Sequence, residues 1–331
     1  MKLKKLSSIL LTSVMAMSVL VGCSSDKEES VEPTQKTTIN VVSPDGLPTM
    51  AIAKLIKENP QINQNYEVNY TIEKTSETLS TSVMKEVPDI AIVPSNMASI
   101  AYNKTQNYKI LGTTGFGSSY IVSTEDLNSY EDLKNKNVVN IGKGLTPDIT
   151  AQFIMASNNL DLSNDLTLSY VNAPSELVPM IVSGKENTAI IPEPALSALM
   201  TKNENVEIFK SLNDEYKEIA NSEYGYPQAT IIVKDSFLKE NTEVVNDFLV
   251  KAEESIKWAN ENPKQLGEYC AEIGVSTEAA MIEKSIERAT LNFVHIKDSK
   301  DIYQKYYDIL FESNKEALGG NLPDEGIFFE E

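Results

Sequence analysis

Residues 87–96 read VPDIAIVPSN: an aspartate leads into four apolar residues, 90–93, which end at a proline. A short apolar run bounded by turn residues is typical of a strand buried on both faces of a sheet. Helical patterns flank the run, over 77–85 before it and from Pro94 through Tyr102 after it. The stretch therefore predicts a strand of a parallel sheet that is covered by helices.

A second stretch, NTAIIP at 187–192, repeats the pattern DIAIVP of 89–94 and also lies between expected helices. Chance resemblance between two apolar strands is an open alternative. Because strands and helices alternate, we expect an α/β fold of two similar lobes with mostly parallel central sheets. The expected strands are 39–42, 68–72, 89–93, 120–122, 138–141, 166–171, 188–191 and 229–233.

Two stretches between these units are candidate crossovers, 112–119 and 224–228, and together they predict a two-stranded hinge. The expected lobes are then 38–115 plus 229–331 for lobe 1 and 116–228 for lobe 2. The remaining chain is predicted to form helices that pack back on lobe 1, over 243–260, 263–273, 277–289 and 300–313.

The N-terminus has the pattern of an export signal. Three lysines in residues 1–5 precede an apolar run over 9–21, and Gly22 stands before Cys23. The run is too short for a comfortable spanning helix, which needs about 20 apolar residues. Cys23 after small residues resembles a bacterial lipobox, so we expect 1–22 to be a lipoprotein signal peptide and 23–37 a flexible tether. A simple secretory signal with an incidental cysteine is the alternative.

Composition narrows the function further. The formal net charge is −19, and since residues 1–22 hold three lysines and no acid, the chain from Cys23 carries −22 (−19 − 3). Such an acidic surface argues against nucleic acid as a partner. With Cys23 on lipid, Cys270 is left alone, so no intramolecular disulfide is expected and Cys270 is interpreted as a buried, inert thiol.

The sequence offers little for catalysis. Its one histidine, His295, lies among apolar residues and is interpreted as structural. There is no Cys/His metal spacing, nucleophile elbow or phosphate loop, and no carboxylate pair is marked out for acid–base chemistry. We therefore expect no enzyme activity, no cofactor and no metal.

Binding is better supported. Ligands of parallel α/β sheets lie beyond the carboxyl ends of the strands, where helices begin. Four such places combine backbone N–H groups with short polar side chains: 43–46, 94–96, 142–146 and 192–193. Ser95 and Thr146 could instead simply cap helices, and Glu193, which could accept hydrogen bonds from an amine, could be a solvated carboxylate.

The single arginine, Arg288, falls on a distant C-terminal segment, which argues against an anion held by arginine at the strand ends. Aromatic residues flank the candidate crossovers and could clamp a flat ligand, although packing explains them equally well. They are Phe116, Tyr120, Tyr224 and Tyr226.

These motifs resemble the periplasmic-binding-protein-like (type II) lobes of ABC importers, in the nitrate, sulfonate and taurine group that includes NMT1/THI5-like proteins. The matching residues are SPDG at 43–46, VPDIAIVPSN at 87–96, and VSG at 182–184 through IPEP at 191–194. Asn187 stands where the family usually has Asp, and Thr188 where it has Ala. Val87-Pro88 replaces the usual Gly.

The resemblance implies a monomeric, lipid-anchored solute-binding protein on the outer face of the membrane, working with an ABC permease and ATPase. It implies capture of a small organic ligand by lobe closure, such as a vitamin precursor or another nitrogen-containing or aromatic compound. Alternatives are an alkanesulfonate, taurine or nitrate-type anion, or a surface receptor without a transport partner. The expected ligand contacts are Asp45, Ser95, Asn96, Phe116, Ser118, Thr146, Glu193 and Tyr226.

Overall fold

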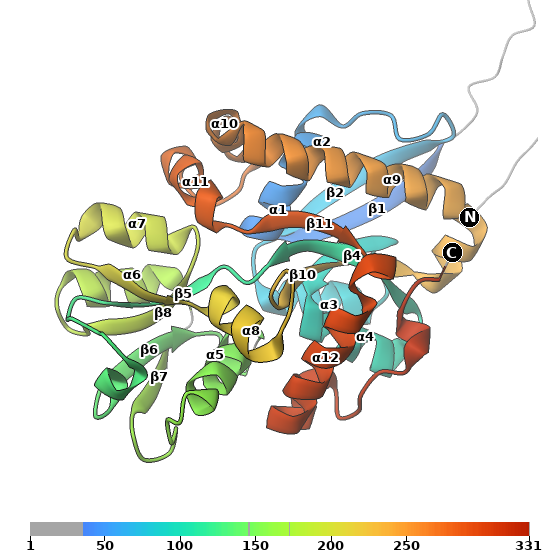
Figure 1. Ribbon diagram of the computed structural model, residues 1–331. Coiled ribbons are helices and arrows are strands. Elements are labelled where there is room, and N and C mark those ends of the chain that lie inside the picture. The colour runs from blue at the N-terminus through green and yellow to red at the C-terminus, as the bar shows by residue number, and fades with distance from the viewer. Residues whose placement is uncertain (1–35, 145, 172, 331) are drawn as a thin grey trace, which may run out of the picture. The chain divides into compact units, whose positions relative to one another are not determined.

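Two separate β-sheets organise the residues that the computed structural model describes, 36–144, 146–171 and 173–330 (Figure 1). The predicted signal peptide, the lipidation site Cys23 and the predicted tether before Lys36 lie outside the described residues. No helix in the described ranges combines the length and the apolar character that crossing a bilayer requires.

The first sheet has six strands in the order β11-β4-β10-β3-β1-β2. β1 runs parallel to β2 and β3, whereas β10 is antiparallel to β3 and β4, and β11 is antiparallel to β4. The strands are β1 (Thr37–Pro44), β2 (Tyr66–Glu73), β3 (Ile90–Pro94), β4 (Tyr108–Phe116), β10 (Pro227–Lys234) and β11 (Leu291–His295).

The second sheet has five strands in the order β7-β6-β8-β5-β9. β6 runs parallel to β7 and β8, and β5 is antiparallel to β8 and β9. The strands are β5 (Ser119–Ser123), β6 (Asn137–Ile141), β7 (Thr167–Val171), β8 (Thr188–Pro192) and β9 (Glu207–Ser211).

The two similar stretches of sequence occupy equivalent places. β3 lies between parallel β1 and antiparallel β10, and β8 lies between parallel β6 and antiparallel β5. Every residue of both strands is buried except the final proline, which explains their unbroken apolar pattern. The predicted α/β fold class is confirmed, and each sheet is mixed because β10 and β5 run against their parallel neighbours.

Helices follow most of the strands and cover the sheets. They are α1 (Leu47–Ala51), α2 (Ala53–Glu58), α3 (Ser76–Met84), α4 (Ser95–Thr105), α5 (Thr146–Ser157), α6 (Pro174–Val182), α7 (Ala195–Lys202), α8 (Leu212–Ala220), α9 (Asp235–Glu261), α10 (Pro263–Ile273), α11 (Ala279–Ser285) and α12 (Ile296–Asn314). α9 is kinked where Asn241 leaves helical geometry, at φ −138° and ψ 33°.

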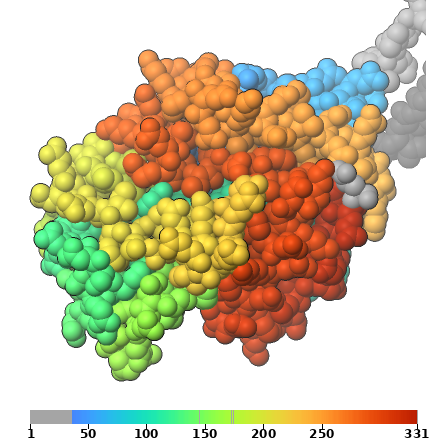
Figure 2. All heavy atoms as spheres, viewed as in Figure 1, coloured from blue at the N-terminus to red at the C-terminus, as the bar shows by residue number. Residues whose placement is uncertain are grey.

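The sequence predicted that the C-terminal helices pack on lobe 1. The structure shows that some of them also contact the second sheet's helices. α9 and α10 contact α2, but α11 also contacts α7, and α12 contacts α5 as well as β4. On the face seen in Figure 2, α8 (yellow) abuts α12 (red), where the Lys305 ammonium donates to the Ala220 carbonyl. The reason is that α11 and α12 flank β11, which returns the chain to the strand that leads into the second sheet.

The apolar core follows the same arrangement. Its largest cluster of buried side chains includes Val93 on β3 of the first sheet and Ile190 on β8 of the second. Tyr226 and Tyr306 belong to the same cluster, and their rings stack with centroids 5.8 Å apart. Burial of apolar side chains therefore links the two sheets directly.

Candidate functional site

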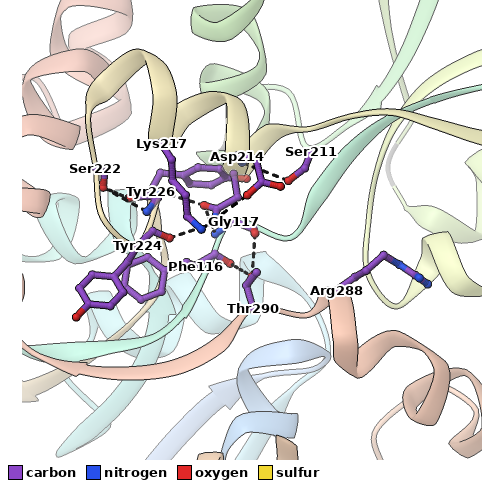
Figure 3. A network of polar contacts seen from close by, with 12 residues as sticks. Phe116, Gly117, Ser211, Asp214, Lys217, Ser222, Tyr224, Tyr226, Arg288 and Thr290 are labelled. Atoms are coloured by element: carbon purple, nitrogen blue, oxygen red, sulfur yellow. Dashed lines mark hydrogen bonds and ion pairs between the residues drawn. The ribbon is translucent and has the colours of Figure 1, made fainter.

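The chain passes between the sheets where the sequence predicts crossovers. β4 runs into β5 through Gly117 and Ser118, and the chain returns from α8 to β10 through 221–226. The two segments are joined by a hydrogen bond from the Gly117 N–H to the Tyr226 carbonyl, 3.1 Å (Figure 3). The two passages thus form a paired, hydrogen-bonded hinge.

Asn213, in the first turn of α8, binds both passages. Its side-chain Oδ1 accepts from the N–H of Gly117 at 3.1 Å and of Tyr226 at 3.2 Å. Its Nδ2 donates to the Tyr224 carbonyl at 3.0 Å, and the residue is buried. The sequence analysis did not identify Asn213, because a single asparagine at a helix start carries no local signal of long-range contacts.

Two glycines make this close packing possible. A Cβ atom on Gly117 would overlap the Tyr226 ring, and one on Gly225 would overlap the Asn213 side chain. Gly225 also has φ +101°, in the region that favours glycine. The hinge therefore depends on the absence of side chains at both positions.

Ser95 and Asn96, at the start of α4, were predicted to contact ligand from the first lobe. The buried Ser95 hydroxyl donates to the Pro227 carbonyl at 2.7 Å and does not cap α4, so the capping alternative is wrong for this residue. Asn96 is also buried, and its Nδ2 donates to the Ala317 carbonyl at 3.3 Å. Both residues tie α4 to other parts of the chain.

Thr146 brings the second sheet to the same place. Its hydroxyl, at the start of α5, donates to Asn96 Oδ1 at 2.9 Å, and both side chains are buried. One turn later, Thr150 shares a 2.7 Å hydrogen bond with the hydroxyl of Tyr306 on α12. The two helix starts at the carboxyl ends of β3 and β6 therefore meet across the sheets.

Asp45 lies apart from this contact. Its carboxylate pairs with Lys74 at 3.1 Å and accepts from the Ser276 N–H, also at 3.1 Å. Burial by itself would raise the pKa of Asp45, but the hydrogen bonds from Ser276 and the positive charge of Lys74 outweigh it and lower the pKa. The carboxylate joins the ends of β1 and β2 to the loop between α10 and α11.

Phe116, Ser118 and Tyr226 lie in the hinge. Phe116 is buried and stacks on Tyr224 with centroids 5.4 Å apart. The Ser118 carbonyl accepts from the Glu193 N–H at 2.9 Å, which connects the hinge to the carboxyl end of β8. Tyr226 is completely buried, and this burial raises the pKa of its hydroxyl.

Glu193 is not the solvated carboxylate of the alternative interpretation, because its side chain is fully buried. It accepts from the N–H and the hydroxyl of Ser197, at 3.0 and 3.1 Å. It also accepts from Nε of Arg288 at 2.6 Å. The prediction that Arg288 is distant from the strand ends is therefore wrong, since β11 pairs with β4 and brings Arg288 beside β8.

The space near these residues is small. A cavity beside Phe116, lined also by Pro48, Gln228 and Leu291, has room for about one water molecule. A broader open groove lies on residues 123–126, 181–184, 203–205 and 207 and includes none of the predicted ligand contacts. A ligand at the strand ends would thus have to separate groups that contact one another in this arrangement.

The described residues give little support to metal binding or to chemistry at the cysteine or the histidine. They contain no group of His, Cys, Asp and Glu that could hold a metal ion. Burial raises the pKa of the Cys270 thiol to about 12, so it is unreactive as expected. His295 Nδ1 accepts from the Lys297 N–H at 3.3 Å and caps α12, which is a structural role.

Comparison with known proteins gives one match to a family and several to solved structures. The model of the family described as NMT1/THI5 like matches residues 63–266. No curated protein matches the chain significantly.

Among solved structures, an ABC transporter protein from Parabacteroides distasonis is 26% identical, with a TM-score of 0.77, over 89% of this chain and 99% of that one. The periplasmic aliphatic sulphonate binding protein SsuA from Escherichia coli is 13% identical, with a TM-score of 0.69, over 84% and 88% of the chains. The periplasmic nitrate-binding protein NrtA from Synechocystis PCC 6803 is 12% identical, with a TM-score of 0.61, over 86% and 84%. These last two likenesses concern the fold alone.

Proposed function

We propose that this chain, which belongs to the NMT1/THI5-like family, is the solute-binding protein of an ABC importer and captures a small organic ligand between two lobes. The observation that carries the proposal is the hydrogen bond between Asn96 and Thr146. It joins two helix starts at the carboxyl ends of strands from different sheets, which is where ligands of such folds bind.

The proposed mechanism is lobe closure. Lobe 1, residues 38–115 plus 229–331, and lobe 2, residues 116–228, would rotate about the hinge at Gly117 and Tyr226. A ligand that contacts both lobes favours the closed form by its differential affinity for that form. The closed complex would then dock on a permease, whose ATPase drives import.

For the ligand, we propose a nitrogen-containing or aromatic compound such as a vitamin precursor. The stacked pair Phe116 and Tyr224 beside the hinge supports a flat ligand. Glu193 gives no support to a nitrogen-containing ligand, because its carboxylate already binds Ser197 and Arg288.

The position of Arg288 favours the second candidate, an alkanesulfonate, taurine or nitrate-type anion. Arg288 lies beside Glu193 at the end of β8, and within the described part of the chain two of its five N–H donors form hydrogen bonds, to Glu193 and Ser197. The names of two similar structures, a sulphonate-binding and a nitrate-binding protein, point in the same direction.

We also propose that the protein is a lipoprotein. Residues 1–22 would be removed, Cys23 would carry the lipid, and the residues from Cys23 to the start of β1 would tether a monomeric binding module to the outer face of the cell membrane. The predicted tether of 23–37 is one residue too long, because Thr37 already pairs with Tyr66 in the first sheet. Holding the module near its permease raises the effective concentration of the complex. A surface receptor with no importer is the remaining alternative, and neighbouring permease and ATPase genes would argue against it.

A thermal-shift screen tests the function and separates the ligand classes. The panel contains pyrimidines, flavins and amino-acid derivatives in one arm, and nitrate, taurine and alkanesulfonates in the other. A ligand at 100 times its Kd stabilises the folded state by about 2.7 kcal/mol, which a melting curve resolves. Stabilisation by the anions alone would overturn the aromatic ligand, and no stabilisation by either arm would contradict a small-molecule binder of these classes.

A further inference from the structure

Residues 288–290, just before β11, form hydrogen bonds with both sheets. We call this segment the brace. Its Arg288 side chain reaches the start of α7, with Nε 2.6 Å from Glu193 Oε1 and Nη2 2.8 Å from Ser197 Oγ. The Arg288 carbonyl accepts from the hydroxyl of Tyr120, on β5, at 2.9 Å. In Figure 3, Arg288 points away from the hinge network, toward the second sheet.

The other end of the brace holds the hinge. The Thr290 hydroxyl donates to the carbonyls of Phe116 at 2.9 Å and Gly117 at 2.8 Å. The Phe116 N–H donates back to the Thr290 carbonyl at 3.1 Å. Thr290 has φ +48°, which is unfavourable for a β-branched residue, and such outliers persist where surrounding contacts impose them.

The two ends of the brace differ in what they bind. Thr290 binds the end of β4, and β11 pairs with β4, so this end belongs to the first sheet. The side chain and carbonyl of Arg288 bind Glu193 after β8, Ser197 in α7 and Tyr120 on β5, so this end belongs to the second sheet and its helices. Any rotation of one sheet relative to the other would therefore strain the Arg288 end first.

The ion pair at that end is costly to break. The Glu193 side chain is 0% exposed and that of Arg288 is 31% exposed. Separation would leave the Glu193 carboxylate with the N–H and hydroxyl of Ser197 as its hydrogen-bond donors in the described part of the chain, and a buried carboxylate without its cation is strongly destabilised. The pair therefore favours the arrangement in which the sheets lie together.

We propose that Arg288 is a positioning residue for lobe closure, whose ion pair with Glu193 holds the two sheets together and must break when the lobes open. The inference rests on the proposed function, since it concerns the closure by which ligand is captured. Loss of the pair would raise the population of open protein. The apparent Kd for ligand would then rise in inverse proportion to the fraction of protein that remains competent to bind.

The test measures the distance between the sheets without ligand. Spin labels are placed on Thr81→Cys in α3 and Ser157→Cys in α5, both exposed, in the full chain carrying Cys23→Ala. Cys270 is buried and stays unlabelled in the folded protein. Pulsed electron–electron double resonance then gives the distribution of distances between the two spin labels. It is measured for the parent and for Arg288→Met, Arg288→Lys and Glu193→Gln.

We expect Arg288→Met and Glu193→Gln to add a second distance population, and Arg288→Lys to restore part of the parent distribution. Lys239→Met is the matched control, because it removes an ion pair within α9, between the exposed Lys239 and the half-buried Asp235 at 2.6 Å. It should leave the distribution unchanged. If Arg288→Met fails to fold, the near-isosteric Glu193→Gln decides the question alone.

A Glu193→Gln protein that unfolds cooperatively and keeps the parent distribution would overturn the inference. Because no ligand enters this experiment, that result would leave the proposed function standing. A failed thermal-shift screen would in turn leave the distance result standing.

Discussion

Thr146 donates a 2.9 Å hydrogen bond to Asn96, and with it the first turns of α5 and α4 meet although they follow strands of different sheets. Both side chains are buried, so the bond is made where water does not compete. A contact of this kind can form only when the two sheets lie together, and it therefore reports on their arrangement.

Replacing Thr146 with Val should weaken that arrangement. The change keeps the shape of the side chain but leaves Asn96 Oδ1 buried without its donor, at a cost of about 1–3 kcal/mol in unfolding free energy. Urea unfolding measures the loss, and affinity for any ligand found in the screen should fall with it. Thr167→Val, at an exposed position of β7, is the control and should change little. Equal urea midpoints for the two variants would contradict the prediction.

Gly117→Ala should damage the hinge. The added Cβ would overlap the buried Tyr226 ring, which is packed against Tyr216 and Tyr306 and cannot move freely. Overpacking of this kind costs about 1–3 kcal/mol, and it should appear as a lower midpoint in chemical unfolding.

Gly115→Ala is the matched control for that experiment. A Cβ there meets its nearest heavy atom, Leu291 Cδ2, at 3.7 Å, which is an ordinary contact. If Gly115→Ala lowers stability as much as Gly117→Ala, the hinge packing is not the cause.

β3 and β8 could be predicted from the sequence because they are buried on both faces. β3 and β8 carry unbroken apolar runs, and the predicted helix at 263–273 coincides with α10. β4, β9 and β11 were not predicted as strands. β4 is an almost entirely buried inner strand, but its glycines and threonines led 112–119 to be interpreted as a crossover. β9 and β11 have no clear apolar period, because β9 is exposed or half-buried throughout and the burial of β11 is irregular.

The partners of the site residues could not be predicted in the same way. The rule for strand ends placed Asp45 and Glu193 correctly along the chain, but what binds them comes from far away in sequence, Ser276 and Arg288. Such contacts depend on the antiparallel pairing of β11 with β4 and on the loops around it, which leave no periodic pattern in the sequence.

Cys23→Ala should separate location from ligand binding. If Cys23 is lipidated, the variant loses its anchor and moves from the membrane fraction to the medium or the soluble fraction. Its thermal stabilisation by ligand should not change, because residue 23 lies before the described fold, which starts at Lys36. Fractionation with detection of the protein measures the first result and the thermal shift the second. A parent protein that is already in the medium or the soluble fraction would argue for the alternative, an ordinary signal with an incidental cysteine, and a variant that stays in the membrane fraction would contradict anchoring through Cys23.

Asp45 should make the stability of the first sheet depend on pH. Hydrogen bonds from Ser276 and the charge of Lys74 lower the pKa of this carboxyl in the folded protein, against the opposing effect of burial. A lowered folded-state pKa adds stability that is present above the unfolded value, about 3.9, and is lost as pH falls through the folded value. Asp45→Asn should therefore destabilise the protein at pH 7 and pH 5, and the difference from the parent should shrink below about pH 4. Urea unfolding at pH 7, pH 5 and pH 3 measures it, with Asp301→Asn on an exposed position of α12 as the control. A difference that stays constant down to pH 3 would show that the charge of Asp45 does not stabilise the fold.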